Sequence, residues 1–264
     1  DALRNTAYGI TTMDAITTGD NNTALGYNTM TANTTAGNNT AIGAEAMLTN
    51  TTGASNVAVG YAALYTNNGA ENVAIGKDAM RLNTTAGQNV AIGFEAMEAN
   101  TTGVRNLAIG YQAYTASDTE NDNLAIGYQA MTTNTAGGEE NIALGNYALD
   151  ALTSGDANVA VGHTALGANT TGYSNVGVGH NSLQACTTGH NNTAVGKSAL
   201  SANCADQNTA FGNSAAIVCT GADNTVVGYF AGGQLSSGSR NLILGHESGS
   251  ALFGNGLFQV TTHD

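Results

Sequence analysis

The side chains best suited to chemistry in this sequence are three cysteines, a pair of histidines and a short acidic loop. Cys186, Cys204 and Cys219 follow one another at intervals close to the period at which the whole chain repeats. Cys204 is therefore expected within disulfide range of one of the other two, which leaves an odd thiol. Three reduced surface cysteines are the alternative interpretation.

His163 and His180 lie one repeat apart and could bind a metal ion, more so if three chains converged. Solvated surface histidines are the favoured interpretation. The loop SDTEND carries Asp118, Glu120 and Asp122, whose oxygens suit Ca²⁺. It lacks the spacing and the glycine of a known calcium loop. We therefore expect a solvated acidic loop, no bound metal and no cofactor.

The motifs and the charge of the chain exclude several classes of function. There is no G-x-S-x-G, no P-loop and no Cys/His cluster with zinc spacing, so we expect no enzymatic activity. The formal net charge of −13 disfavours nucleic acids and anionic lipid surfaces. No apolar run reaches the roughly 18 residues of a membrane span, so we expect no membrane insertion. Because no Met precedes Asp1, we read the chain as a mature or excised part of a longer one.

A short motif such as NTAIG or NVAVG recurs along the chain and must position all these side chains. Fifteen copies end in a Gly, which defines position 0, and ten of the 14 intervals between these glycines are 17 residues. Asn stands at position −4 in all 15 copies, and Ala stands at position −2 in twelve. The period is too short for the two-helix units of helical repeats, and Gly, Asn and Thr disfavour a helix interior.

A 17-residue period suits one coil of a parallel β-solenoid, or β-roll, with two short strands and two turns. We therefore predict an all-β fold of about fifteen coils. Positions −3 and −1 carry β-branched or apolar residues, for example Val90 and Ile92, and strand alternation predicts that both face the coil interior. On this interpretation Ile92→Asp should unfold several coils. The Ala residues at −2 would then form a flat outer strip on which copies associate, most simply as a homotrimer.

Other columns of the repeat have structural interpretations. Position +4 holds all six methionines, which we expect to fill the core rather than bind metal. The Asn residues at −4 are expected to form a ladder in which side-chain amides hydrogen-bond between successive coils. Central members of this ladder are Asn39, Asn56, Asn72, Asn89, Asn106 and Asn123. Loop triplets NTT match N-glycosylation acceptors, although a repeated turn sequence also explains them. These triplets begin at Asn33, Asn50, Asn83, Asn100 and Asn169.

The motifs NVAVGYAAL, NVAIGFEAM and NLAIGYQAM resemble the head repeats of trimeric autotransporter adhesins. Similar repeats with the longer NTTG loop occur in tail-fibre-like proteins of bacteriophages. The resemblance spans Asn5 to about Gly249 and implies a left-handed parallel β-roll, a homotrimer and an extracellular location, on a virion appendage or a cell surface. The period is longer than that of the adhesin heads, which leaves phage and bacterial origins both open.

The resemblance implies a structural, non-enzymatic shaft of an extracellular fibre that supports attachment. Two alternatives are that the chain itself binds a surface polysaccharide or host receptor, and that it is a subunit of a self-assembling extracellular filament. Ice binding is disfavoured because the threonines lie in irregular loops. Aromatic residues at position +1 offer a platform for sugar rings or a contact with a neighbouring subunit. These aromatic residues are Tyr27, Tyr61, Phe94, Tyr111, Tyr128 and Tyr229.

The end of the chain departs from the repeat, because VTTHD does not match the motif due near residue 262. The preceding stretch, Leu252 to Val260, is more apolar than any loop before it. An open solenoid end must be covered. We therefore predict a repeat region over 1–249 and a segment over 250–264 that caps it or leads into a further domain, with Phe253 or Phe258 over the last coil.

Overall fold

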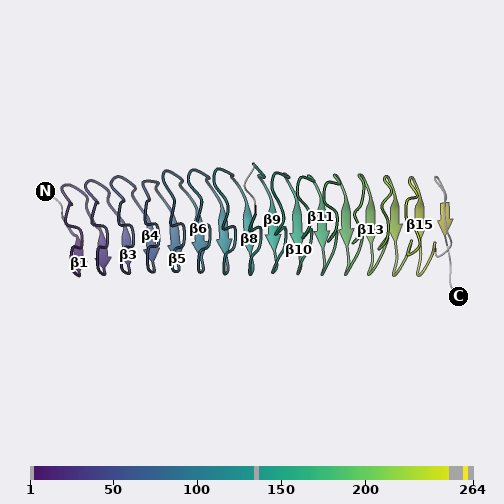
Figure 1. Cartoon of the computed structure of the whole chain (residues 1–264), viewed down its shortest axis with the longest axis horizontal. Helices are drawn as coiled ribbons and strands as arrows, with labels where there is room; N and C mark the ends of the chain where they lie inside the picture. The colour runs from purple at the N-terminus through teal and green to yellow at the C-terminus, as the bar shows by residue number, and fades with distance from the viewer. Residues whose placement is uncertain (1–2, 134–136, 250–257, 261–264) are drawn as a thin grey trace. The chain divides into compact units, whose positions relative to one another are not determined.

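A computed structural model describes residues 3–133, 137–249 and 258–260 of the chain. The chain divides into two compact units, Asp1–Thr135 and Ala136–Asp264. Each unit is a stack of coils, and each coil contributes one three-residue strand to a parallel sheet (Figure 1). The described residues form about fourteen coils and contain no α-helix, hence none that could cross a bilayer. The prediction of an all-β parallel solenoid is confirmed.

Each unit holds eight of these strands in chain order. The first unit contains β1 (Thr6–Tyr8), β2 (Thr23–Leu25), β3 (Thr40–Ile42), β4 (Val57–Val59), β5 (Val73–Ile75), β6 (Val90–Ile92), β7 (Leu107–Ile109) and β8 (Leu124–Ile126). The second contains β9 (Ile142–Leu144), β10 (Val159–Val161), β11 (Val176–Val178), β12 (Thr193–Val195), β13 (Thr209–Phe211), β14 (Thr225–Val227), β15 (Leu242–Leu244) and β16 (Phe258–Val260).

Neighbouring strands within a unit pair in parallel with equal positions opposite each other. In the β6–β7 pair, for example, Ala91 lies opposite Ala108 and Ile92 opposite Ile109. Each repeat position therefore forms a column that runs from coil to coil. β-Branched and apolar residues at −3 and −1 favour the extended strand. The glycine that follows ends the strand at positive φ. At Gly162, where φ is 139°, a Cβ atom would lie 2.6 Å from the carbonyl oxygen of Gly179 in the next coil, so only glycine fits.

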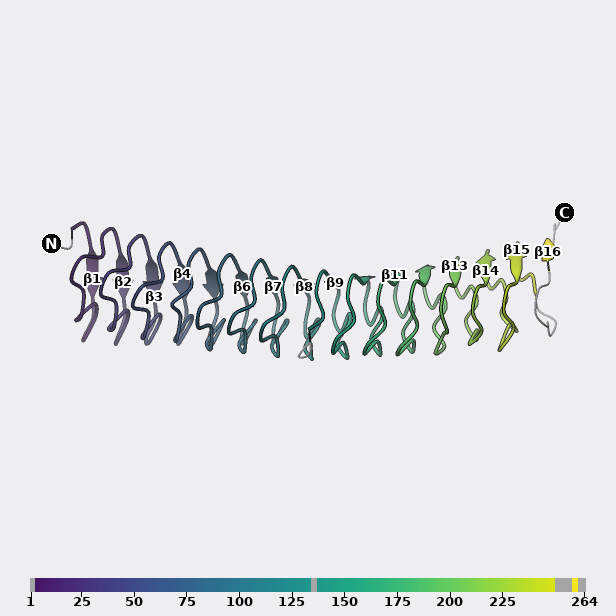
Figure 2. The same cartoon turned by 90° about the horizontal axis from the view of Figure 1, so that it is seen from above.

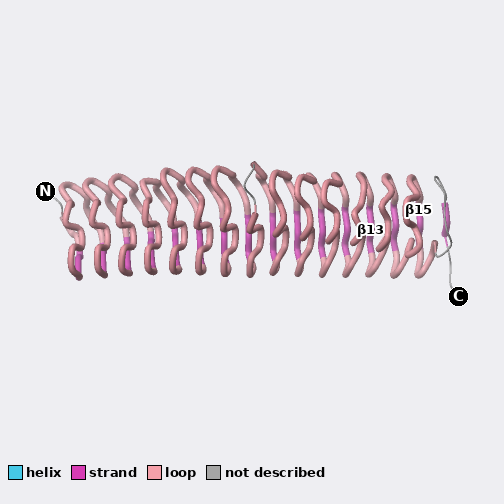
Figure 3. The backbone as a smooth tube through the Cα atoms, in the orientation of Figure 1, coloured by secondary structure: helices cyan, strands magenta, loops and turns pink. Residues whose placement is uncertain are grey.

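The prediction of a second strand in each coil is wrong. The chain beyond the glycine is a run of turns, as the tube in Figure 3 shows, and the strands of each unit share one side of the coils (Figure 2). Positions +2 and +4 adopt left-handed backbone angles, with φ of 52° at Glu95 and 53° at Met97. Such angles cost a non-glycine residue about 1 kcal/mol. Backbone hydrogen bonds between coils hold them, since the Met97 amide donates to the Ala113 carbonyl at 3.0 Å.

The predicted orientation of the strand is also wrong, because the small residue at −2 faces the core. Ala91 and Ala108 are fully buried, whereas the residues on either side of them, such as Val90 and Ile92, are only half-buried. The interior is narrow: Ala at −2 meets Ala at +3 and Met or Leu at +4, all of which are buried. The methionine column therefore fills the core as predicted, and alanine at −2 leaves room for it.

The exceptions at position −2 explain why alanine is the usual choice. At Gly177 a Cβ atom would meet Leu166 Cγ, at position +4 of the preceding coil, at 3.4 Å. Where the residue at −2 is larger than alanine, the residue at +4 of the preceding repeat is smaller than methionine or leucine. Ile243 follows Gly232, at which a Cβ atom would lie 3.5 Å from Ile243 Cδ1. Val226 likewise follows Ala216 at +4. These compensating sizes were visible in the sequence and would have revealed the true orientation.

Part of the C-terminal segment continues the stack. Phe258–Val260 forms β16, which pairs with β15 so that Phe258 lies opposite Leu242, at a spacing of 16 residues that the repeat also uses upstream. These three residues therefore follow the coil path, contrary to the expectation that they leave it. Residues 250–257, which include Leu252 and Phe253, lie outside the described residues. The domain boundary at 249 stays a prediction.

Candidate interaction surface

The outward side of each sheet is a largely aliphatic surface, although its residues were predicted to face the core; position −3 is Thr in β1–β3 and in β12–β14. We call it the aliphatic face and define it by positions −3 and −1 of the strands. Ile75 retains 38% of its surface exposed, and Phe211 retains 56%. Neither column carries a charged residue in the described strands. In β4–β8 the face consists of Val57, Val59, Val73, Ile75, Val90, Ile92, Leu107, Ile109, Leu124 and Ile126. In β9–β11 it consists of Ile142, Leu144, Val159, Val161, Val176 and Val178.

A column of rings at position +1 borders the aliphatic face. Phe94 stacks on Tyr111 with ring centroids 5.1 Å apart, and Tyr111 stacks on Tyr128 at 5.2 Å. Their planes differ by only 9° and 8°. Lys77 Nζ lies 5.0 Å from the centroid of the Phe94 ring, at a distance typical of a cation–π contact. The rings therefore cover one another's faces and present their edges outward.

This stacking weakens the interpretation of the rings as a sugar platform, because a sugar packs against the face of a ring. Tyr229 is likewise stacked, on His246 at 5.1 Å. Tyr61 is exposed and hydrogen-bonded to Glu45, and this bond to a carboxylate raises the pKa of its hydroxyl. Tyr27 is 54% exposed. The six residues thus share a column, but three of them form one ladder with few free faces.

Two histidines of this column also stack on each other. His163 and His180 have ring centroids 5.3 Å apart and planes inclined by 15°, with Tyr147 at the edge of His163. Parallel imidazoles point their nitrogen lone pairs in the same direction rather than at a common point. No group of three or more His, Cys, Asp or Glu suited to a metal ion occurs within the part of the chain that the structure describes.

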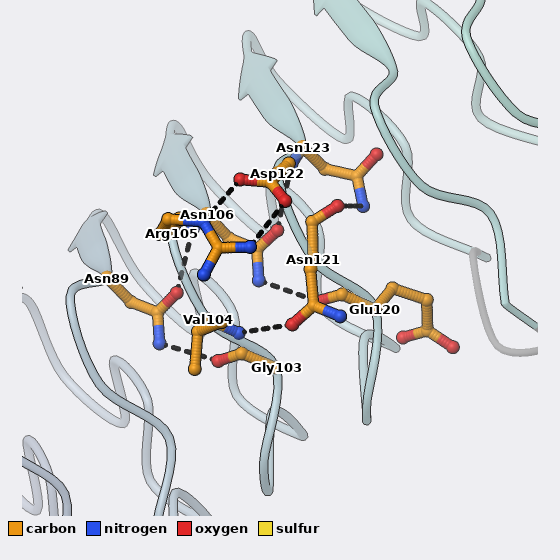
Figure 4. A network of polar contacts seen from close by, with 9 residues as sticks. All are labelled: Asn89, Gly103, Val104, Arg105, Asn106, Glu120, Asn121, Asp122 and Asn123. Atoms are coloured by element: carbon orange, nitrogen blue, oxygen red, sulfur yellow. Dashed lines mark hydrogen bonds and ion pairs between the residues drawn. The ribbon is translucent and has the colours of Figure 1, made fainter.

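The asparagines at −4 join successive coils from inside the core. Asn106 donates its backbone N–H to Asn89 Oδ1 at 2.8 Å, and its Oδ1 accepts the backbone N–H of Asn123 at 2.9 Å (Figure 4). Its Nδ2 donates to the Glu120 carbonyl at 2.7 Å. The same bonds recur at Asn39, Asn56 and Asn72. In this ladder the side-chain oxygen of each asparagine accepts the backbone N–H of the asparagine in the next coil. In the second unit, as at Asn158 and Asn175, Nδ2 also donates to the preceding amide oxygen.

An ion pair lies on the polar edge of the sheet, at position −5. Arg105 Nε and Nη2 donate to the two carboxylate oxygens of Asp122 at 2.6 Å each (Figure 4). This bidentate bond lowers the pKa of Asp122 below its usual value. The acidic loop is consequently not a set of converging oxygens. Glu120 is buried and accepts the backbone N–H groups of Asp118 and Thr119, so its carboxylate caps the loop.

The cysteines occupy a buried column rather than the surface. Cys186 and Cys204 form a disulfide across adjacent coils, with Cα atoms 5.1 Å apart. Cys219 is a free thiol with no exposed surface, and burial raises its pKa. The expectation of one disulfide and one odd thiol agrees with this arrangement. The alternative of reduced surface cysteines does not agree with it, because all three cysteines are buried.

The asparagines of the NTT triplets are structural. Asn33, Asn50, Asn83, Asn100 and Asn169 are fully buried. Asn50 accepts the Gly53 N–H at 3.0 Å and donates to the Gly53 carbonyl at 2.9 Å, which closes the loop. Asn169 makes the same pair of bonds with Gly172. A glycan on these amides would have to break the loop, so the bonds favour the interpretation of the triplets as a repeated turn sequence.

No protein-family model, curated protein or solved structure matches this chain. The fold and its surfaces are therefore the basis for the function proposed below.

Proposed function

We propose that this chain is a structural, non-enzymatic shaft segment of an extracellular fibre that supports attachment. The observation that carries the proposal is the uniform coil-to-coil connection. The Asn ladder, the strand and the turn repeat the same bonds from each coil to the next within a unit. A stack of this kind gains stability from nearest-neighbour contacts, so its length can grow by adding repeats. That property suits a spacer.

The disulfide supports an extracellular location. Cys186 and Cys204 pair within the core of the second unit. Structural disulfides persist in oxidising compartments and are rare in the reducing cytosol. A virion appendage and a cell-surface fibre both meet this condition.

The exposed aliphatic face supports self-association, and we propose a homotrimer. Contiguous apolar surface of this kind marks interaction sites in soluble proteins. Three copies arranged around a common axis can each turn the aliphatic face inward, so that no copy is left with this face uncovered. Native mass measurement should give three chains, and a stable, soluble monomer would contradict this part of the proposal.

A self-assembling filament is the second candidate, since the same face could join copies without closing a ring. Binding of a surface polysaccharide or receptor by the chain itself is less favoured, because Phe94, Tyr111 and Tyr128 cover one another's ring faces.

A binding assay and electron microscopy test the shaft proposal together. The purified chain should appear as elongated particles of constant width. Its retention on surface polysaccharides should be absent, or unchanged in the Tyr111→Ser, Tyr128→Ser double variant. Compact particles would contradict a shaft. Polysaccharide binding that the double variant loses would favour the recognition alternative instead.

A further inference from the structure

The aliphatic face has properties that point to one particular occupant. Its strands lie in register at about 4.8 Å intervals, so its side chains form two straight columns. Ile75 and Ile109 both lie in the −1 column of the first unit. A surface with such a strict period fits best against another surface with the same period, because ridges and grooves then match along its whole length. The sheet of a second copy has that period.

Charge favours the same occupant. The chain carries a formal net charge of −13, so two copies repel one another across most of their surfaces. The aliphatic face is the exception, since positions −3 and −1 of the described strands hold no charged residue. Face-to-face contact between copies therefore buries no carboxylate. A basic partner would gain nothing from this face and would bind elsewhere.

The area is also sufficient. The eight strands of the first unit, at about 4.8 Å each, extend for about 38 Å, and the strip from position −3 to +1 is about 13 Å wide. Each copy thus offers on the order of 500 Å² from this unit alone. Two copies together bury about 1,000 Å², which reaches the lower limit of a specific interface. The second unit carries an aliphatic face of its own.

We infer that the aliphatic face, and not the alanine column, is the surface through which copies of this chain associate, with the ring column at its rim. The inference rests on the self-association proposed above and names the residues that perform it. In the assembled protein Ile75, Ile109 and their neighbours are covered by the same columns of another copy. The alanines at −2 remain inside each coil.

Two outward-facing charge variants test this inference by sedimentation equilibrium. Ile75→Lys with Ile109→Lys places two charges on the aliphatic face. Thr85→Lys with Thr102→Lys places the same charges on exposed loop residues of the first unit. The wild type and the loop variant should sediment with the same multiple of the chain mass. The face variant should sediment as a single chain and retain the far-ultraviolet circular dichroism of the wild type.

The outcomes separate this inference from self-association itself. A face variant that keeps the wild-type mass would overturn the aliphatic face as the interface, while self-association would stand. A wild type that is a single chain at every concentration would overturn both. If the face variant fails to fold, a photo-crosslinking residue at position 109, compared with one at position 102, gives the answer. Crosslinks between copies from 109 alone are expected, and crosslinks from 102 alone would contradict the inference.

Discussion

At the scale of single residues, the asparagine at −4 contributes most to the repeat. Asn106 satisfies a backbone donor on one neighbouring coil and a loop carbonyl at once, in a site that water does not reach. A fully buried polar side chain is tolerated only when it is bonded in this way. Its invariance along the chain therefore follows from the bonds it makes to the backbone, not from stacking of amides alone.

Replacing Asn106 by alanine should destabilise the protein strongly. The substitution removes two buried hydrogen bonds, one to the Asn123 N–H and one to the Glu120 carbonyl. Removing one partner of a buried hydrogen bond costs about 1–3 kcal/mol, so losing both bonds should lower the free energy of unfolding by about 2–6 kcal/mol. The matched control is Thr102→Ala at an exposed loop position, which should change stability by less than about 0.5 kcal/mol. Urea unfolding measures both, and equal effects would show that the ladder contributes little.

The cysteines allow a second prediction at this scale. Because Cys186 is bonded to Cys204 and Cys219 is buried, the native protein should not react with a thiol reagent. After unfolding without reductant, one thiol per chain should react. Three reactive thiols in the unfolded chain would contradict the disulfide, and rapid reaction of the native protein would contradict the burial of Cys219.

At the scale of the element, each coil is a strand facing a run of turns across a narrow core of Ala at −2 and +3 and Met or Leu at +4. The 17-residue period and the asparagine column predicted the parallel stack, because those features depend on local spacing. Orientation could not be predicted from alternation alone, since a three-residue strand such as Val90–Ile92 has apolar residues at all three positions. Only the volumes opposite it decide which side is core. The left-handed turns were missed because methionine at +4 gives no local sign of positive φ.

A double-mutant cycle tests the packing of −2 against +4. Ala108 follows Met97 in the same way that Val226 follows Ala216. Ala108→Val should cost about 1–3 kcal/mol by overpacking, and Met97→Ala about 2–5 kcal/mol by opening a cavity. The double variant recreates the natural pair of Val226 and Ala216. Its loss of unfolding free energy should therefore be smaller than the sum of the losses in the two single variants. Strict additivity in thermal unfolding would contradict the contact.

At the scale of the whole molecule, each strand turns its small residue at −2 toward a core filled by Met or Leu at +4, and turns its larger residues at −3 and −1 outward. Ala91 and Ala108 are fully buried, whereas Ile75 keeps 38% of its surface exposed. This arrangement is unfavourable for an isolated chain, because aliphatic surface remains in water. It becomes favourable when copies associate. The proposed shaft and its interface both follow from this single feature.

The measurement that tests this account most directly compares two adjacent substitutions on one strand, Ala91→Asp and Ile92→Asp. Ala91 faces the closed core, where an unpaired carboxylate cannot be solvated, so its variant should lose the β-sheet signal in far-ultraviolet circular dichroism. Ile92 faces outward, so its variant should keep that signal as a folded single chain. A folded Ala91→Asp protein beside an unfolded Ile92→Asp protein would contradict the account.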